Sequence, residues 1–194
     1  MDKIIESHPF EPFIPNNAKV LMLGTFPPKP ERWSMEFFYP NWINDMWRIM
    51  GCIFYGNEKH FVDGEHRRFD LTRIKQFLND AGIALFDTGV KVIRHKDNAS
   101  DKFLEIVERV DLHTMLEQNV TIRSIVTAGE KATSVAAELI GVKAPKMGEY
   151  VDAEYCNRQI RLFRMPSSSR AYPMSLAKKV EYYSTMFALN DIHL

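Results

Sequence analysis

Short, continuously apolar runs recur along the chain, and three of them end close to a glycine. Runs of this kind are typical of strands in a parallel sheet, because helices cover both faces of such a sheet. A fourth run is less apolar, and we expect it at an edge of the sheet. The predicted strands cover residues 20–23, 83–89, 123–129 and 159–169.

Amphipathic helical patterns separate these runs. Gly82 and Gly141 predict the ends of two of the helices. Strands that alternate with helices of this length indicate crossover units, and hence a parallel sheet with helices on both faces. The stretch 142–158 indicates only a connecting loop or a short extra strand. The predicted helices cover residues 43–50, 71–82, 103–119, 130–141 and 175–190.

Length and composition fit one globular domain that spans residues 1–194, since 45% of the 194 residues are hydrophobic. No apolar stretch is long enough to cross a bilayer, and the start of the chain lacks the features of a signal peptide, so we expect a cytoplasmic protein. The two cysteines and six histidines lack metal-binding spacing. We therefore expect no metal site, no cofactor and no disulfide framework.

The chain carries 25 basic and 25 acidic residues, and therefore no net charge. This balance argues against a protein that holds nucleic acid mainly through its overall electrostatic field. A local basic patch is still allowed, at residues 66–75 or between Arg170 and Lys179. For the first of these clusters, a solvated helix face is the simpler interpretation.

The carboxyl ends of the predicted strands are the places to search for a site, because ligands of open parallel sheets bind beyond those ends. The third of these ends predicts an ordinary exit into a helix at Gly129, since neither nucleotide-binding glycine motif is present. The four strand-end segments are 24–28, 86–89, 128–131 and 165–172.

Three aromatic residues, Phe37, Phe38 and Tyr39, stand immediately before Pro40. Pro40 interrupts a helix or a central strand, so the three rings are expected in a loop where a planar ligand could stack. Stacking on an aromatic ring contributes about 1–3 kcal/mol for any nucleobase. Trp47, in contrast, is interpreted as a core residue of a helix.

Three serines, Ser167, Ser168 and Ser169, follow the fourth predicted strand, and Arg170 comes next. Their hydroxyls and backbone N–H groups suit a phosphate. The alternative is a loop that caps the following helix, with Ser175 as the N-cap. The residues alone do not decide between the two.

The order of these segments resembles the uracil-DNA glycosylase superfamily, with the mismatch-specific uracil glycosylases and the hypoxanthine glycosylases as the nearest branches. The similar features are a strand running into G-x-x-P at Gly24, an aromatic–asparagine segment leading to N-x-x-W-R, and a late strand running into x-P-S-x-S. The second and third strands extend the resemblance over most of the chain. It implies an α/β fold, a three-layer α/β/α sandwich with a short, mainly parallel four-stranded sheet.

The resemblance also implies a DNA base-excision glycosylase, which hydrolyses the N-glycosidic bond of a deaminated base, uracil or hypoxanthine, flipped out of DNA. We therefore expect a monomer whose partner is double-stranded DNA with a damaged or mismatched base. Two alternatives stay open: a catalytically silent member that binds a base or damaged DNA, and a hydrolase of small N-glycosides. Action on DNA would require one basic face around the cleft, formed by Arg32, Arg170, Lys178 and Lys179.

Carried over onto this sequence, the resemblance assigns base-binding and DNA-binding roles to particular residues. Tyr39 matches the aromatic that stacks on the base, and Asp87 matches the polar residue that faces its pairing edge, although a helix or loop cap is the alternative for Asp87. Phe26 would form another wall. The full base-binding set is Gly24, Thr25, Phe26, Pro27, Tyr39 and Asp87, and the DNA-binding set is Ser167, Ser168, Ser169 and Arg170.

Two positions depart from the family pattern. Relatives carry Asn, Asp or Glu where this chain has Phe26, and often His or Asn where it has Met165. This pattern resembles the hypoxanthine-acting branch, in which an asparagine after the stacking aromatic becomes important, and Asn41 matches that place. We expect Asn41 to orient water or the leaving base, with Asn44 as the second catalytic candidate. An amide cannot remove a proton at neutral pH, but it can hold a water and polarise a leaving group.

Overall fold

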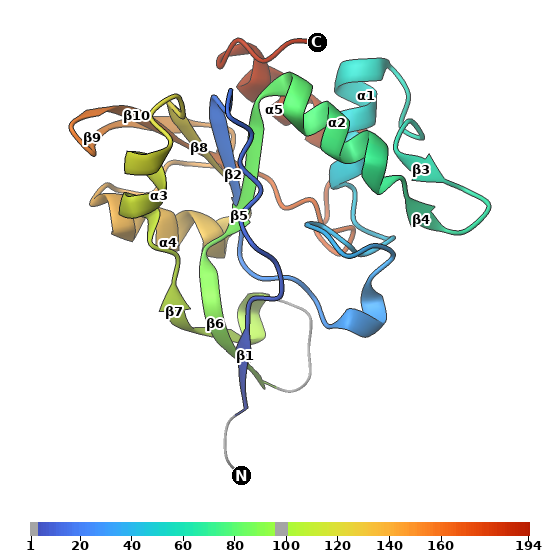
Figure 1. Ribbon diagram of the computed structural model, residues 1–194, viewed down its shortest axis with the longest axis horizontal. Coiled ribbons are helices and arrows are strands. Elements are labelled where there is room, and N and C mark those ends of the chain that lie inside the picture. Colours follow the sequence, from blue (N-terminus) through green and yellow to red (C-terminus); the bar gives the residue numbers. More distant parts are fainter. Residues whose placement is uncertain (1–3, 96–100) are drawn as a thin grey trace.

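The computed structural model describes residues 4–95 and 101–194, and a five-stranded sheet forms its centre (Figure 1). The strand order is β5-β2-β8-β10-β9; the first four strands are parallel, and β9 is antiparallel to β10. This arrangement confirms the predicted α/β class with a mainly parallel sheet. The strands are β2 (Val20–Gly24), β5 (Ile83–Asp87), β8 (Ser124–Ala128), β9 (Tyr150–Tyr155) and β10 (Arg158–Met165).

The sheet has five strands rather than the predicted four, and β10 lies inside it rather than at its edge. The additional edge strand is β9, which comes from the stretch 142–158. It joins β10 through a two-residue turn, Cys156 and Asn157, whose φ angles are 52° and 55°. Two consecutive positive φ angles define the hairpin turn that matches the twist of antiparallel strands.

Helices cover both faces of the sheet, as the alternation of strands and helices predicted. In Figure 1, α3 and α4 lie below β9 and β10, whereas α1 and α2 lie to the right of β2 and β5, and α5 packs against α1. Gly82 and Gly141 end α2 and α4 with φ angles of 69° and 80°, which confirms both predicted stops. Within residues 4–95 and 101–194, none of the helices has the length and apolarity of a membrane span. The helices are α1 (Met46–Tyr55), α2 (Leu71–Ala81), α3 (Leu112–Gln118), α4 (Glu130–Ile140) and α5 (Leu176–Ala188), with short 3₁₀ helices η1 (Pro30–Arg32) and η3 (Asp101–Phe103).

The predicted helix over 103–119 is wrong in its first half, where the chain forms a strand of a second sheet. That sheet is antiparallel, with the order β1-β6-β7. The segment begins with the two-residue period of a strand, since Leu104 is buried and Glu105 is exposed. The helix starts further along, where Asp111 is the N-cap and accepts from the backbone N–H of Thr114. The three strands are β1 (Ile5–Ser7), β6 (Gly89–Arg94) and β7 (Leu104–Arg109).

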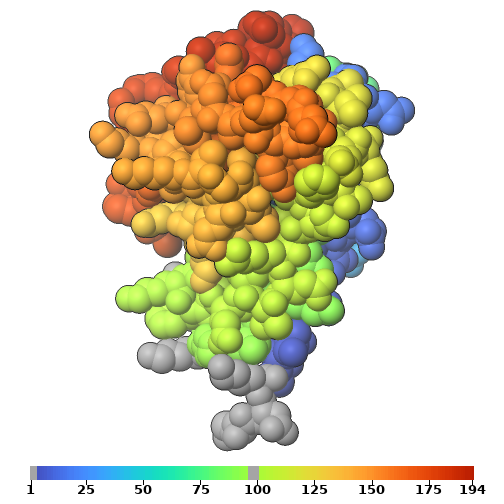
Figure 2. Space-filling view, turned by 90° about the vertical axis from the view of Figure 1, so that its left-hand side faces the viewer, coloured from blue at the N-terminus to red at the C-terminus, as the bar shows by residue number. Residues whose placement is uncertain are grey.

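The basic cluster 66–75, interpreted above as a helix face, is divided between two elements. Its first part belongs to a hairpin of β3 (Val62–Asp63) and β4 (Arg68–Phe69), and its second part starts α2. Figure 2 shows the left-hand side of Figure 1, where the orange segments of β9 and β10 lie above the green segments of the second sheet. In Figure 1 the hairpin lies at the right and β9 at the left, so the hairpin lies away from the edge of the central sheet that β9 forms.

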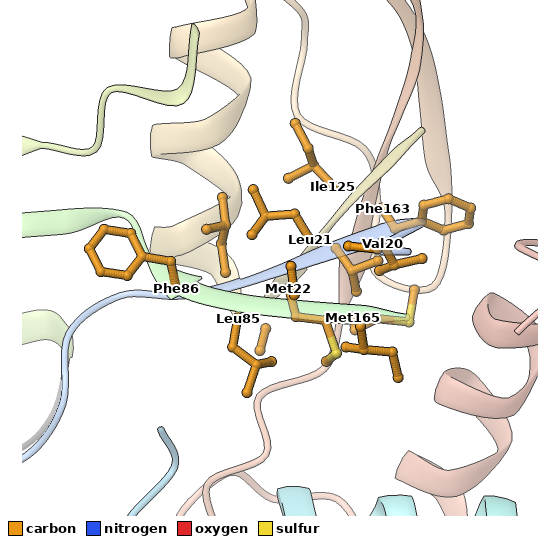
Figure 3. Close-up of a cluster of buried hydrophobic side chains, with 14 of the residues drawn as sticks. Val20, Leu21, Met22, Leu85, Phe86, Ile125, Phe163 and Met165 are labelled. Atoms are coloured by element: carbon orange, nitrogen blue, oxygen red, sulfur yellow. The ribbon is translucent and has the colours of Figure 1, made fainter. Parts of the chain in front are cut away.

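The core lies between the central sheet and its helices, and every residue of β2, β5 and β8 is buried. Figure 3 shows Leu21, Met22 and Ile125 of neighbouring strands within one apolar cluster. Trp47 is fully buried, as predicted. Close packing of this kind makes the three strands a rigid platform, and their carboxyl ends meet at one side of it.

Candidate active site

A cavity of about 490 Å³ lies at the carboxyl ends of β2, β5 and β8. The chain runs from β2 outward to β5 and then returns to β8 on the other side of β2, so the cavity lies where the strand order reverses. All the candidate residues except Arg170 line this cavity, although they come from four separate segments. The lining candidates are Gly24, Thr25, Phe26, Pro27, Tyr39, Asn41, Asn44, Asp87, Ser167, Ser168 and Ser169.

Gly24 allows the carboxylate of Asp87 to lie directly against the end of β2. The two residues are paired in the parallel register of β2 and β5. A Cβ atom on Gly24 would be only 2.4 Å from Oδ1 of Asp87. Glycine is therefore required at this position for the observed place of the carboxylate.

His8, which the sequence analysis did not single out, holds the other oxygen of Asp87. The distance from Nε2 of His8 to Oδ2 of Asp87 is 2.9 Å, and the His8 side chain is only 3% exposed. The backbone N–H of Phe10 donates to Nδ1 of His8. In the tautomer that accepts at Nδ1, Nε2 carries the proton and donates it to the carboxylate. The carboxylate orientation is therefore fixed from outside the cavity.

Of the three consecutive aromatics, only Tyr39 lines the cavity, because Phe37 and Phe38 are buried in the core. Tyr39 has a φ of 51°, a left-handed conformation that costs a non-glycine residue about 1–2 kcal/mol. Its ring packs edge-on against Trp47. Strain of this kind persists only where the surrounding packing enforces it.

The Tyr39 hydroxyl is buried and has no hydrogen-bond partner among the described residues. Burial raises the pKa of this hydroxyl well above its ordinary value, and the nearby Tyr183, Asp87 and Asp101 raise it further. The hydroxyl is therefore a neutral group that retains a proton to donate. The hydroxyl lies close to the end of β2, since a Cβ atom on Gly24 would be 3.7 Å from its oxygen.

Asn41 and Asn44 both line the cavity, and both use their side-chain oxygen in the local turn. Oδ1 of Asn41 accepts from the backbone N–H of Ile43 (3.1 Å), and Oδ1 of Asn44 accepts from that of Met46 (2.9 Å). Arg48 supports this turn by donating to the carbonyl of Asn44. Because each oxygen is engaged in the turn, the amide N–H₂ groups are the atoms that these residues can offer to a ligand.

A buried ion pair joins two loops, the asparagine loop (residues 41–45) and the serine loop (residues 167–170). Nζ of Lys179, whose side chain is completely buried, lies 3.0 Å from Oδ2 of Asp45 and also donates to the carbonyl of Ser169. Nε of Arg170 lies 2.8 Å from Oδ1 of Asp45. In addition, the backbone N–H of Asp45 donates to the carbonyl of Ser168. The two loops are thus held together through Asp45.

The expected basic face of Arg32, Arg170, Lys178 and Lys179 is not formed around the cleft, and this dispersal favours the hydrolase of small N-glycosides among the functions left open. Lys179 is buried and cannot reach a partner in solution, whereas Lys178 is exposed and pairs with Glu181. Arg170 is half-exposed, but it does not line the cavity. Ser175 caps α5 by accepting from the backbone N–H of Lys178, as one of the two interpretations of the serine segment predicted.

Asp101 and Lys131 are further residues that sequence reasoning missed. The hydroxyl of Thr25 donates to Oδ2 of Asp101 (2.7 Å), and Asp101 lines the cavity. Burial raises the pKa of Asp101. The hydrogen bond from Thr25 lowers this pKa, and the nearby Asp87 raises it, so that it stays above its ordinary value. Lys131, in the segment interpreted as an ordinary strand exit, donates to the backbone carbonyls of Asp101 and Leu104.

The two positions that depart from the family pattern offer no polar side-chain atom. Phe26 lines the cavity and packs edge-on against His8, with 5.3 Å between the ring centroids. Met165 is buried at the end of β10. Any polar chemistry in the cavity must therefore come from other residues.

A second, open groove of about 470 Å³ lies beside the cavity, and Arg32 lines both. Arg67 and Arg68 of the β3–β4 hairpin contribute two further guanidinium groups to it, and Arg68 is paired with Asp63. The groove also contains two indole rings and one acidic side chain. The lining residues are Glu31, Arg32, Trp33, Ser34, Trp42, His66, Arg67 and Arg68.

Comparison with known proteins supports the fold. No protein-family model and no curated protein matches the sequence. Among solved structures, the chain is similar to the solution NMR structure of a protein from Methanosarcina acetivorans that is provisionally assigned as a uracil DNA glycosylase. The two chains are 20% identical, with a TM-score of 0.63, and the match covers 97% of this chain and 99% of that chain. The match therefore shows that the two chains share one α/β fold.

The buried ion pair yields a test of how the two loops are held together. Lys179→Met leaves the buried carboxylate of Asp45 with Arg170 alone, so we expect it to lower the free energy of unfolding by about 3 kcal/mol, near the lower end of the range for a broken buried pair. Urea titration measures this change. Lys178→Met is the matched control, because it removes only an exposed pair, and its unfolding midpoint should not change. Equal midpoints for both variants would contradict the role of the pair.

The contact between Gly24 and Asp87 yields a second test. Gly24→Ala inserts a methyl group against the carboxylate, and we expect it to destabilise the protein by about 1–3 kcal/mol. In the Asp87→Ala background the same substitution should cost less, because the clashing oxygen is gone. Gly64→Ala is the control, since a Cβ atom at Gly64 meets no heavy atom within 4 Å. A Gly24→Ala penalty that is unchanged without the carboxylate would exclude this explanation.

Proposed function

We propose that the protein is a DNA N-glycosylase that removes a deaminated base from DNA. The observation that carries the proposal is the convergence of four distant segments on one cavity that combines an aromatic ring, a carboxylate and two amides. A volume of about 490 Å³ is within the usual range for sites that bind small molecules or extruded groups. The shared fold with a protein provisionally assigned as a uracil DNA glycosylase supports the same class of reaction.

The carboxylate of Asp87 explains why a deaminated base would be preferred. Deamination converts the ring nitrogen of the pairing edge from an acceptor in cytosine or adenine into an N–H donor in uracil or hypoxanthine. An ionised carboxylate only accepts hydrogen bonds, so it attracts the deaminated base and repels the parent base. His8 fixes the acceptor. The Tyr39 hydroxyl, which has no partner within residues 4–95 and 101–194, can donate to a neighbouring carbonyl of the base. A base that lacks these complementary groups would leave the buried carboxylate and hydroxyl without partners, and this penalty disfavours its binding.

Asn41 and Asn44 supply the support that the departing base requires. As the N-glycosidic bond breaks, negative charge develops on the base and positive charge on the sugar. The amide N–H₂ groups, free of the local turns, can donate to the base as its charge increases. Since an amide is not a base at neutral pH, these two residues assist departure and do not remove the proton from water.

The groove beside the cavity is the surface that we assign to the DNA backbone. Its lining contains three arginines, of which Arg68 is paired with Asp63, and one acidic residue, Glu31, although the whole chain has no net charge. Arg32 lines both hollows, so one DNA strand could contact the groove and the cavity together. Contacts of this kind position DNA and carry no sequence information.

An excision assay tests the proposed reaction. Duplexes containing hypoxanthine or uracil are incubated with the protein and cleaved at abasic sites with alkali, and we expect strand breaks from wild type. Asn41→Ala should lower the single-turnover rate by about tenfold or more, because one donor to the departing base is lost. Asn57→Ala is the matched control: Asn57 makes the same side-chain contact to the backbone, with the N–H of Lys59, but does not line the cavity.

The outcomes of this assay separate the three functions that the sequence allows. If wild type and Asn41→Ala are equally inert but both shift labelled DNA in a gel, the result would support a binding module instead. Cleavage of free nucleosides without cleavage of duplexes would support a hydrolase of small N-glycosides. A rate that falls equally in Asn41→Ala and Asn57→Ala would exclude a specific role for Asn41.

Salt dependence tests the groove. The double variant Arg32→Ala/Arg67→Ala should bind a hypoxanthine duplex more weakly, and its slope of log K against log salt should decrease by about 1.8, since each lost phosphate contact removes about 0.9. Arg123→Ala is the control, because Arg123 is exposed just before β8, at the opposite end of that strand from the cavity. An unchanged slope in the double variant would exclude the groove as the DNA surface.

A further inference from the structure

Two acidic side chains among the described residues line the cavity, and each has its own anchor. Asp87, at the end of β5, is held by His8 near the Tyr39 hydroxyl. Asp101, at the start of η3, accepts at Oδ2 from the hydroxyl of Thr25. Because the two carboxylates enter from different elements and have different partners, they can perform different tasks.

We propose that Asp101 holds and activates the attacking water, an assignment that rests on the proposed glycosylase function. Thr25, its hydrogen-bond partner, directly precedes Phe26, so the carboxylate lies beside the first strand-end loop, where the Phe26 side chain offers no polar atom. Among the described residues, the Thr25 hydroxyl is the one group that donates to this carboxylate, and it donates to Oδ2. Oδ1 is the atom assigned to the water.

The backbone around Asp101 is held in place by Lys131. Nζ of Lys131 donates to the carbonyl of Asp101 (2.9 Å) and to that of Leu104, so it spans the whole of η3. Lys131 thus holds the backbone at both ends of η3, and it leaves the Asp101 carboxylate in its hydrogen bond with Thr25. A catalytic group requires fixed geometry of this kind, because small misplacements reduce the rate strongly.

The charges around Asp101 favour a basic carboxylate. Burial raises its pKa, and Asp87 raises it further, while the hydrogen bond from Thr25 and the cations Lys131 and Arg94 oppose the increase. The net direction is upward. An ionised carboxylate with a raised pKa takes a proton from water more readily than an ordinary aspartate does.

The reaction balances without any further reactant. The C1′–N bond breaks, and its electron pair leaves with the base. The oxygen of the water forms the new bond to C1′, and one proton of that water passes to the Asp101 carboxylate. The departing base gains a proton from solvent, and Asp101 later returns its own to solvent.

Asp101→Asn tests the assignment. In single-turnover excision from the hypoxanthine and uracil duplexes, we expect a rate loss of about 100-fold or more, with affinity for the same duplexes within about threefold of wild type. Asp111→Asn is the matched control. Asp111 also accepts from a threonine hydroxyl, that of Thr114 (2.8 Å), but lies outside the cavity, and asparagine preserves its role as a helix cap. Its rate should equal that of wild type.

Two further readouts separate catalysis from a structural role. The wild-type rate should fall as the pH is lowered through the raised pKa of Asp101, and this acid limb should be absent from the residual rate of Asp101→Asn. The pKa of Asp101 is higher in the folded than in the unfolded state, so folding favours its protonated form. The stability that Asp101 contributes is therefore fully present below about pH 4, the ordinary pKa of an unfolded aspartate. This stability is lost as the pH rises through the folded pKa. At pH 7, therefore, Asp101→Asn should unfold at the same or a higher temperature.

Every outcome decides the assignment. If wild type excises a base and Asp101→Asn retains its rate and its acid limb, the assignment of the water to Asp101 is overturned while the proposed function stands. If Asp101→Asn loses its rate but also unfolds at a lower temperature, Asp101 has a structural role and the assignment is overturned. If wild type is inert on all duplexes, the proposed function fails and this assignment fails with it.

Discussion

The ion pair between Lys179 and Asp45 is central to the candidate site, because it joins two loops of the cavity whose direct backbone pairing is limited to an isolated bridge between Asn44 and Ser169. Bringing both charges out of water costs several kcal/mol, and apolar residues of similar volume often stabilise a core as well or better. The contribution of the pair is therefore positional. Nζ of Lys179 lies between Asp45 and the carbonyl of Ser169, and it therefore sets the placement of the asparagine loop relative to the serine loop.

The sequence predicted the central strands and the location of the site because both follow from local patterns. Strands covered on both faces are continuously apolar, and β2, β5 and β8 have that pattern. Their parallel order requires that their carboxyl ends meet, so Gly24, Asp87 and the serine loop could be grouped without any contact being known. The segment 103–119 was predicted wrongly because its apolar residues fit both a two-residue and a helical period. Only pairing with β6 decides for the strand.

The groups that the sequence analysis missed are those whose meaning depends on contacts between distant residues. His8 meets Asp87 at a separation of 79 residues, and Asp101 meets Thr25 at a separation of 76. Neither belongs to a recognisable motif, and a lone histidine or aspartate in a polar segment gives no local signal. Lys179 was misjudged for a related reason, since a lysine in an amphipathic helix is usually exposed. Its burial follows from the acidic residue on another loop that it meets.

The position of Lys179 in the chain has a consequence for biosynthesis. The ribosome completes β2, the aromatic loop and α1 long before α5 is available, and chains begin to fold from the N-terminus as they emerge. Until α5 packs against α1, the carboxylate of Asp45 has no lysine partner, and the carbonyl of Ser169 lacks the donor that Lys179 provides. A nascent chain therefore lacks the ionic link between the two loops until its last helix is in place. Because both loops line the cavity, the cavity acquires its final wall only in the last stage of folding.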